Sequence, residues 1–163
     1  MERTLIRLAV LILAPGLLLP VAARADFDIC QLLSKDQATA LLGAPVADSP
    51  LAASLMCRFS AANDPKDVAF VTIIDLGETT KMLYDGKAKE SGTTPVAGLG
   101  DAAFRSEDLT ASPKEYYITV LAGTRMLQLT TAGIHQDDPH AALVTAAKAA
   151  LANLAKHASA PAK

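Results

Sequence analysis

The sequence predicts an α+β fold: a mainly antiparallel sheet of about five strands with helices packed on one face and one disulfide bond. Three observations lead to this prediction. Helix-like segments stand singly between runs of neighbouring strand-like segments, whereas a parallel sheet would need strict alternation of the two. The strand-like segments are rich in β-branched and aromatic residues. The chain contains 2 cysteines, so one intramolecular pairing is available.

Residues 1–25 have the three parts of a cleavable secretory signal peptide. Arg3 and Arg7 make the start basic, residues 8–23 are almost entirely apolar, and residues 23–25 form a small-x-small cleavage site. A retained membrane anchor is the alternative, but two prolines and a glycine interrupt the apolar run and leave no clear stretch of about 20 residues for a spanning helix. The pattern therefore favours cleavage.

The rest of the chain has the length of one domain. We expect a single α+β domain over residues 26–158 and a flexible tail over residues 159–163. Cys30 does not follow the cleavage site directly, as the cysteine of a bacterial lipoprotein would, so we expect no stable membrane anchor after cleavage. The predicted location is the bacterial periplasm or the medium outside the cell.

The charge balance argues against nucleic acid as a partner. Removing the three arginines and one glutamate of residues 1–25 from the 15 basic and 17 acidic residues leaves 12 and 16, a net charge of about −4 with histidines neutral. Nucleic acids and anionic membrane surfaces are bound by clustered Lys and Arg. We therefore expect no nucleic-acid partner.

Two of the predicted helices lie in the first half of the chain. Ser34 can cap a helix, Gln37 completes a capping box, and Gly43 supplies the left-handed stop. Thr79 or Thr80 could cap a second helix that runs to about Glu90.

The third predicted helix begins with Asp138 as its cap and Pro139 at its first position. A glycine-containing turn joins the last two strands as a hairpin. The predicted strands are Met56 to Ala61, Asp67 to Leu76, a strand that includes Phe104, Glu115 to Leu121, and Arg125 to Thr131.

Cys30 and Cys57 are expected to form a structural disulfide. Both lie in the part of the chain that is exported, where disulfides persist, and they are the only two cysteines. A redox-active or metal-binding thiol pair is the alternative. The close Cys-x-x-Cys spacing that lowers a thiol pKa is absent.

Four short segments carry a resemblance to a known group of proteins. They are Cys30-Gln31-Leu32-Leu33-Ser34, Leu41-Leu42-Gly43-Ala44-Pro45-Val46, Cys57-Arg58-Phe59 and Val96-Ala97-Gly98-Leu99-Gly100-Asp101-Ala102-Ala103-Phe104. Together they resemble small secreted bacterial domains of the DUF3558 and extracellular sensor-domain-like group. The resemblance implies the same architecture, with a Cys30–Cys57 bridge and a helix-backed antiparallel sheet. It implies no activity, since that group is largely without known chemistry.

One polar cluster could ligate a metal ion. His135, Asp137 and His140 bring two imidazoles and a carboxylate within six residues, and these are ligands for zinc or copper. The alternative is structural, because Asp138 is explained by helix capping and Asp137 by the helix dipole.

Three aromatic residues could line an apolar ligand groove between the sheet and the helices: Phe104, Tyr116 and Tyr117. Packing in the core or on a half-buried strand is the simpler explanation for them. The segment Gly98-Leu99-Gly100-Asp101 is expected to form a tight turn, with anion binding by its backbone amides as the alternative.

These observations favour an exported, non-catalytic binding or interaction domain without a cofactor, whose partner is an unknown envelope protein or a small ligand. One alternative is a small hydrolase that uses a metal at the histidines or separated carboxylates. Another is an accessory subunit of an envelope complex, which would have an exposed apolar patch. The carboxylates considered for hydrolysis are Asp75, Glu78, Glu107 and Asp108.

Overall fold

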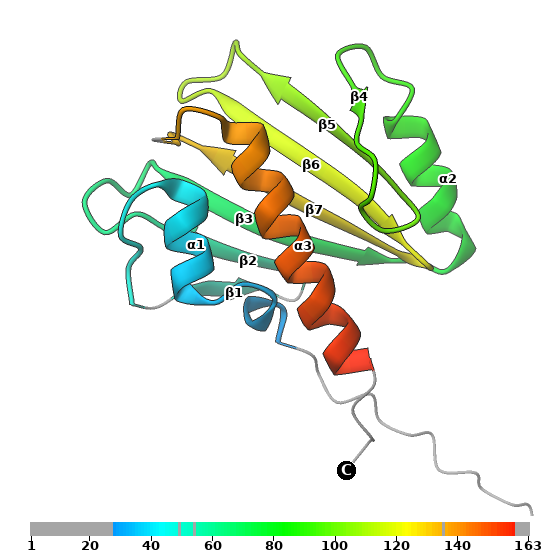
Figure 1. The fold of residues 1–163 in the computed structure, drawn as a ribbon, viewed down its shortest axis with the longest axis horizontal. Coiled ribbons are helices and arrows are strands. Elements are labelled where there is room, and N and C mark those ends of the chain that lie inside the picture. Colours follow the sequence, from blue (N-terminus) through cyan, green and yellow to red (C-terminus); the bar gives the residue numbers. More distant parts are fainter. Residues whose placement is uncertain (1–27, 49, 54, 135, 159–163) are drawn as a thin grey trace, which may run out of the picture.

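The computed structural model describes residues 28–48, 50–53, 55–134 and 136–158. The predicted signal peptide at residues 1–25, the predicted tail at residues 159–163, and His135 lie outside these ranges. Within the described ranges the chain is α+β, with an antiparallel sheet of seven strands in the order β1-β2-β3-β7-β6-β5-β4 (Figure 1). No helix in these ranges combines the length and hydropathy needed to cross a membrane.

The elements follow one another along the chain as follows: η1 (Ile29–Leu32, a short 3-10 helix), α1 (Lys35–Leu42), β1 (Leu51–Ala53), β2 (Met56–Ser60), β3 (Val68–Asp75), α2 (Glu78–Lys87), β4 (Thr94–Pro95), β5 (Ala102–Asp108), β6 (Glu115–Ala122), β7 (Arg125–Ala132) and α3 (Pro139–Ala158).

The predicted number of about five strands was too low, because both edge strands were missed. Strand β1 has three residues and β4 has two, one of them Pro95. Segments this short show no periodicity, and proline is otherwise a sign against a strand. They are strands because β2 and β5 supply hydrogen-bonding partners beside them.

The prediction that the helices pack on one face was wrong for α2. Figure 1 shows α1 and α3 in front of the sheet, where they cover a core that includes Ile118 and Val120 of β6. Leu121 belongs instead to a second cluster, with Tyr84 of α2. Because successive residues of a strand point to opposite faces, α2 packs on the other face. Strand alternation alone does not specify which face a given helix will cover.

The helix ends follow the sequence pattern closely. In α1, the Ser34 hydroxyl accepts a hydrogen bond from the Gln37 amide at 3.2 Å, and the Gln37 side chain accepts one from the Ser34 amide at 2.8 Å. In α3, the Asp138 carboxylate accepts from the Ala141 amide at 3.0 Å. Both predicted caps are confirmed.

Helix α2 begins differently from the prediction. Its N-cap is Gly77, ahead of Thr79 and Thr80. The buried Thr80 hydroxyl accepts a hydrogen bond from the Leu76 amide at 2.7 Å, so it fastens the end of β3 to the first turn of the helix.

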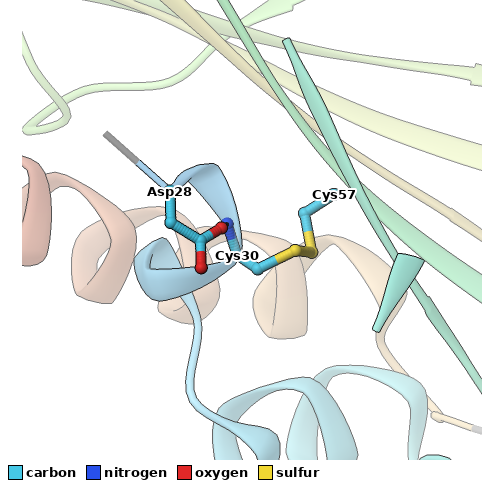
Figure 2. Close-up of a disulfide and its surroundings, with 3 residues drawn as sticks. All are labelled: Asp28, Cys30 and Cys57. Carbon is cyan, nitrogen blue, oxygen red and sulfur yellow. A yellow bond between two sulfur atoms is a disulfide. The ribbon is translucent and has the colours of Figure 1, made fainter. Parts of the chain in front are cut away.

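The predicted disulfide is present between Cys30 of η1 and Cys57 of β2 (Figure 2). Their Cα atoms lie 5.1 Å apart, and Cys57 is completely buried. Asp28 caps η1 by accepting a hydrogen bond from the Cys30 amide at 2.9 Å. The disulfide therefore attaches the start of the described chain to the sheet beneath α3.

Candidate functional site

The sheet separates the three aromatic residues predicted to line one groove. Tyr116 lies on the face covered by α1 and α3, whereas Phe104 and Tyr117 lie on the other face. Phe104 is buried against Tyr84 of α2, with ring centroids 5.3 Å apart. The three residues therefore do not line a common groove.

Tyr116 instead meets a residue from the predicted metal cluster. Its ring contacts His140, the second residue of α3, in an edge-on arrangement with centroids 5.5 Å apart. The His140 Nε2 atom lies 3.4 Å from an oxygen of Glu107. Glu107 and Tyr116 are paired in the register of β5 and β6, so their side chains stand side by side under the start of α3.

The predicted metal set at His135, Asp137 and His140 stays a prediction, because His135 lies outside the described ranges. In the part of the chain that is described, no group of three or more His, Cys, Asp or Glu side chains could hold a metal ion. Asp138 serves the helix cap, as the structural alternative expected.

A cleft of about 550 Å³ lies next to His140, between the β4–β5 edge and the first two turns of α3. Its wall is largely apolar, with Pro95 and Val96 on the strand side and Val144 on the helix side. Its ionisable residues are Arg105, Asp138 and His140.

Arg105 occupies a position that elsewhere in the sheet belongs to the core. Across the strands it is in register with Ile118 and Leu129, both completely buried. Helix α3 packs over β6 and β7, however, and Arg105 on β5 is exposed. The charged side chain thus lies on the helix-covered face of the sheet and borders the cleft.

The three ionisable residues of the cleft differ in how they are engaged. The Asp138 carboxylate accepts from the Ala141 amide, and His140 faces Glu107. The Arg105 guanidinium has no hydrogen bond or ion pair with any other described residue. Among the described residues that line the cleft, it is therefore the charged side chain without a hydrogen-bond or ion-pair partner.

Sequence reasoning singled out Tyr116 and His140 in separate sets but missed Arg105. A pattern in β5 could have found it. Ala103, Arg105 and Glu107 alternate on one face, and two successive charges there indicate that the strand leaves the core and borders solvent.

Comparison of the chain with protein-family models, curated proteins and solved structures gives no match. The resemblance to the DUF3558 group therefore stays a prediction.

Proposed function

We propose that this chain is an exported binding domain, periplasmic or secreted, that holds a small ligand in the cleft between β4, β5 and α3. The observation that carries the proposal is the unpartnered Arg105 guanidinium in a cleft whose wall is largely apolar. Small-molecule sites commonly combine an apolar wall with a few placed polar groups, and their volumes run from roughly 300 to 1,000 Å³.

Export is supported by two independent features. Residues 1–25 have the pattern of a signal peptide. The Cys30–Cys57 disulfide is of a kind that persists in oxidising compartments and is rare in the cytosol.

The geometry around His140 supports binding better than acid–base catalysis. Its Nε2 atom faces Glu107, and its Nδ1 atom is buried without a hydrogen-bond partner in the described structure. A general base needs a nitrogen within hydrogen-bond reach of the proton that it removes from the substrate. In the described structure Glu107 lies next to Nε2.

The alternative of an accessory subunit is supported by exposed apolar residues on a different part of the surface. Among the described residues, large apolar side chains are exposed just before and on α2, namely Leu76, Met82 and Leu83. Exposed apolar residues are common singly, so they favour a protein partner less strongly than the cleft favours a small ligand.

The test fills the cleft with a larger side chain. Ala141 is exposed and lines the cleft, so Ala141→Trp should occupy it without disturbing the core. We expect native mass spectrometry to detect a bound small molecule on the wild-type protein after incubation with a small-molecule extract of bacterial envelopes. The variant should lose this added mass.

The matched control is Ala152→Trp, which adds the same side chain at an exposed position of α3 that does not line the cleft. It should retain the bound molecule. A wild-type protein without added mass, or an Ala141→Trp variant that still carries the molecule, would contradict the proposed function.

A further inference from the structure

We propose that the ligand of the cleft is an apolar monocarboxylate, with its carboxylate on Arg105 and its hydrocarbon part against Pro95, Val96 and Val144. This inference rests on the proposed function and adds the chemical class of the ligand.

The Arg105 guanidinium is suited to bind a carboxylate. It is planar and carries five N–H donors in a fork that matches the two oxygens of a carboxylate. It borders the cleft, is exposed, and has no partner in the described part of the chain. A charged hydrogen-bond donor in this position favours an anionic group on the ligand.

The charges around the cleft limit the charge of the ligand. Glu107 faces His140, so among the described residues that line the cleft Arg105 is the permanently charged cation without a hydrogen-bond or ion-pair partner. Asp138 also lines the cleft and would repel excess negative charge. Because Asp138 carries a negative charge in the same cleft, it would repel a dianion such as a phosphate monoester more strongly than a monoanion. A ligand with a single negative charge, placed on Arg105, is therefore favoured over a dianion.

The rest of the wall indicates the remainder of the ligand. Beyond the three ionisable residues, the wall consists of two threonines and five apolar residues, namely Thr94, Thr145, Pro95, Val96, Ala97, Ala141 and Val144. The Thr145 hydroxyl, which also lines the cleft, already donates to the Ala141 carbonyl at 3.0 Å. A sugar or another polyhydroxylated ligand would find few partners for its hydroxyl groups, whereas a hydrocarbon chain would lose little on leaving water.

Two sources can supply this chemistry: a free aliphatic acid, or the C-terminal carboxylate of a peptide that ends in apolar residues. Both place one carboxylate beside a hydrocarbon group. Probes of each kind distinguish the two sources.

The experiment compares hexanoate with hexanamide, which has nearly the same shape but no charge. Binding is followed by NMR chemical-shift changes in the wild-type protein. Because charge-assisted hydrogen bonds are roughly twice as strong as neutral ones, we expect hexanoate to bind about 10-fold more tightly than hexanamide or better. Arg105→Gln should remove this difference by weakening hexanoate binding alone.

Lys148→Gln is the matched control, because it removes the same charge from an exposed position of α3 outside the cleft. It should leave hexanoate binding unchanged. The tripeptide acetyl-Ala-Val-Leu is then compared with its C-terminal amide. Tighter binding of the free-acid peptide than of hexanoate identifies a peptide C-terminus as the source, and weaker binding identifies a free acid.

The possible failures are distinguishable. Equal binding of hexanoate and hexanamide, abolished for both by Ala141→Trp, would overturn the carboxylate inference and leave the proposed function standing. If Arg105→Gln binds hexanoate as tightly as the wild-type protein does, the carboxylate inference is overturned as well. If no probe binds and the wild-type protein also carries no extracted molecule, both the inference and the proposed function fail.

Discussion

Tyr117 acquires its chemical environment from neighbouring residues of the sheet. It lies beside Thr130 of β7, on the face opposite α1 and α3. Its hydroxyl donates a hydrogen bond to the Glu115 carboxylate, two residues away on the same strand. Partial burial, together with the hydrogen bond to Glu115 and its negative charge, raises the pKa of Tyr117 to about 12. The neutral phenol is therefore the form that the folded protein favours.

This environment predicts a dependence of stability on pH. The unfolded chain releases the Tyr117 proton near its ordinary pKa of about 10, whereas the folded protein keeps it until about pH 12. Between these values the unfolded state binds fewer protons, so the free energy of unfolding falls as the pH rises. The stabilising contribution is complete below pH 10. Tyr117→Phe should reduce this fall, as measured by urea unfolding between pH 9 and 11.

The same variant should remove the last step of the tyrosine titration followed by ultraviolet absorbance. If wild type and Tyr117→Phe lose the same stability over this pH range, the assigned environment of Tyr117 is wrong.

At the scale of elements, one turn couples two hairpins. The segment from Gly98 to Asp101 is the tight turn that the sequence predicts, with φ of 75° at Gly98 and 54° at Gly100. The Asp101 amide donates to the Leu121 carbonyl at 2.8 Å, and its carboxylate accepts from the Gly123 amide at 2.6 Å. The start of β5 is thereby attached to the β6–β7 turn.

The two glycines of this turn give a matched pair of variants. A Cβ atom at Gly100 would lie 2.4 Å from the Leu121 carbonyl oxygen, while nothing lies within 4 Å of one at Gly98. Gly98→Ala should lower the free energy of unfolding by about 1 to 2 kcal/mol, because alanine is strained in the left-handed backbone conformation of this position. Gly100→Ala adds a steric overlap and should lower it by about 3 kcal/mol or more.

Urea denaturation of both variants measures this difference. Equal losses would show that the close approach of Gly100 to β6 does not contribute to stability.

At the scale of the whole molecule, covalent and apolar contacts act together at the start of the described chain. Ile29 and Leu32 of η1 belong to the core beneath α3, and Cys30 between them is bonded to β2. The Asn153 side chain of α3 donates to the Leu32 carbonyl at 3.1 Å. The first described residues are thus held by both the sheet and the last helix.

Removal of the disulfide should therefore destabilise the whole domain. The bond closes a loop between residues separated by 27 positions, for which chain entropy gives about 3 to 4 kcal/mol. The double variant Cys30→Ala/Cys57→Ala should lose about this much stability in urea denaturation. Wild-type protein under reducing conditions should lose a similar amount. An unfolding midpoint that does not change with reductant would argue against a stabilising disulfide.

Part of the candidate site could be predicted from the sequence. Tyr116 and His140 were both singled out, and Asp138 was assigned to the helix cap that it forms. The meeting of His140 with Glu107 could not be predicted, since 33 positions separate them. It depends on strand register and on the placement of α3, and neither is encoded in a short segment.

The features that could be predicted from the sequence alone depend on neighbours a few residues away. The Ser34–Gln37 capping box, the Asp138 cap and the β6–β7 hairpin are of this kind, and the disulfide was limited to one pairing by the number of cysteines. Three further features follow only from the folded chain: β1 and β4 are strands, α2 packs on the second face, and Arg105 borders a cleft. A cap is completed by the chain's own next turn, whereas an edge strand, a covered face and a cleft exist only where distant segments are brought together.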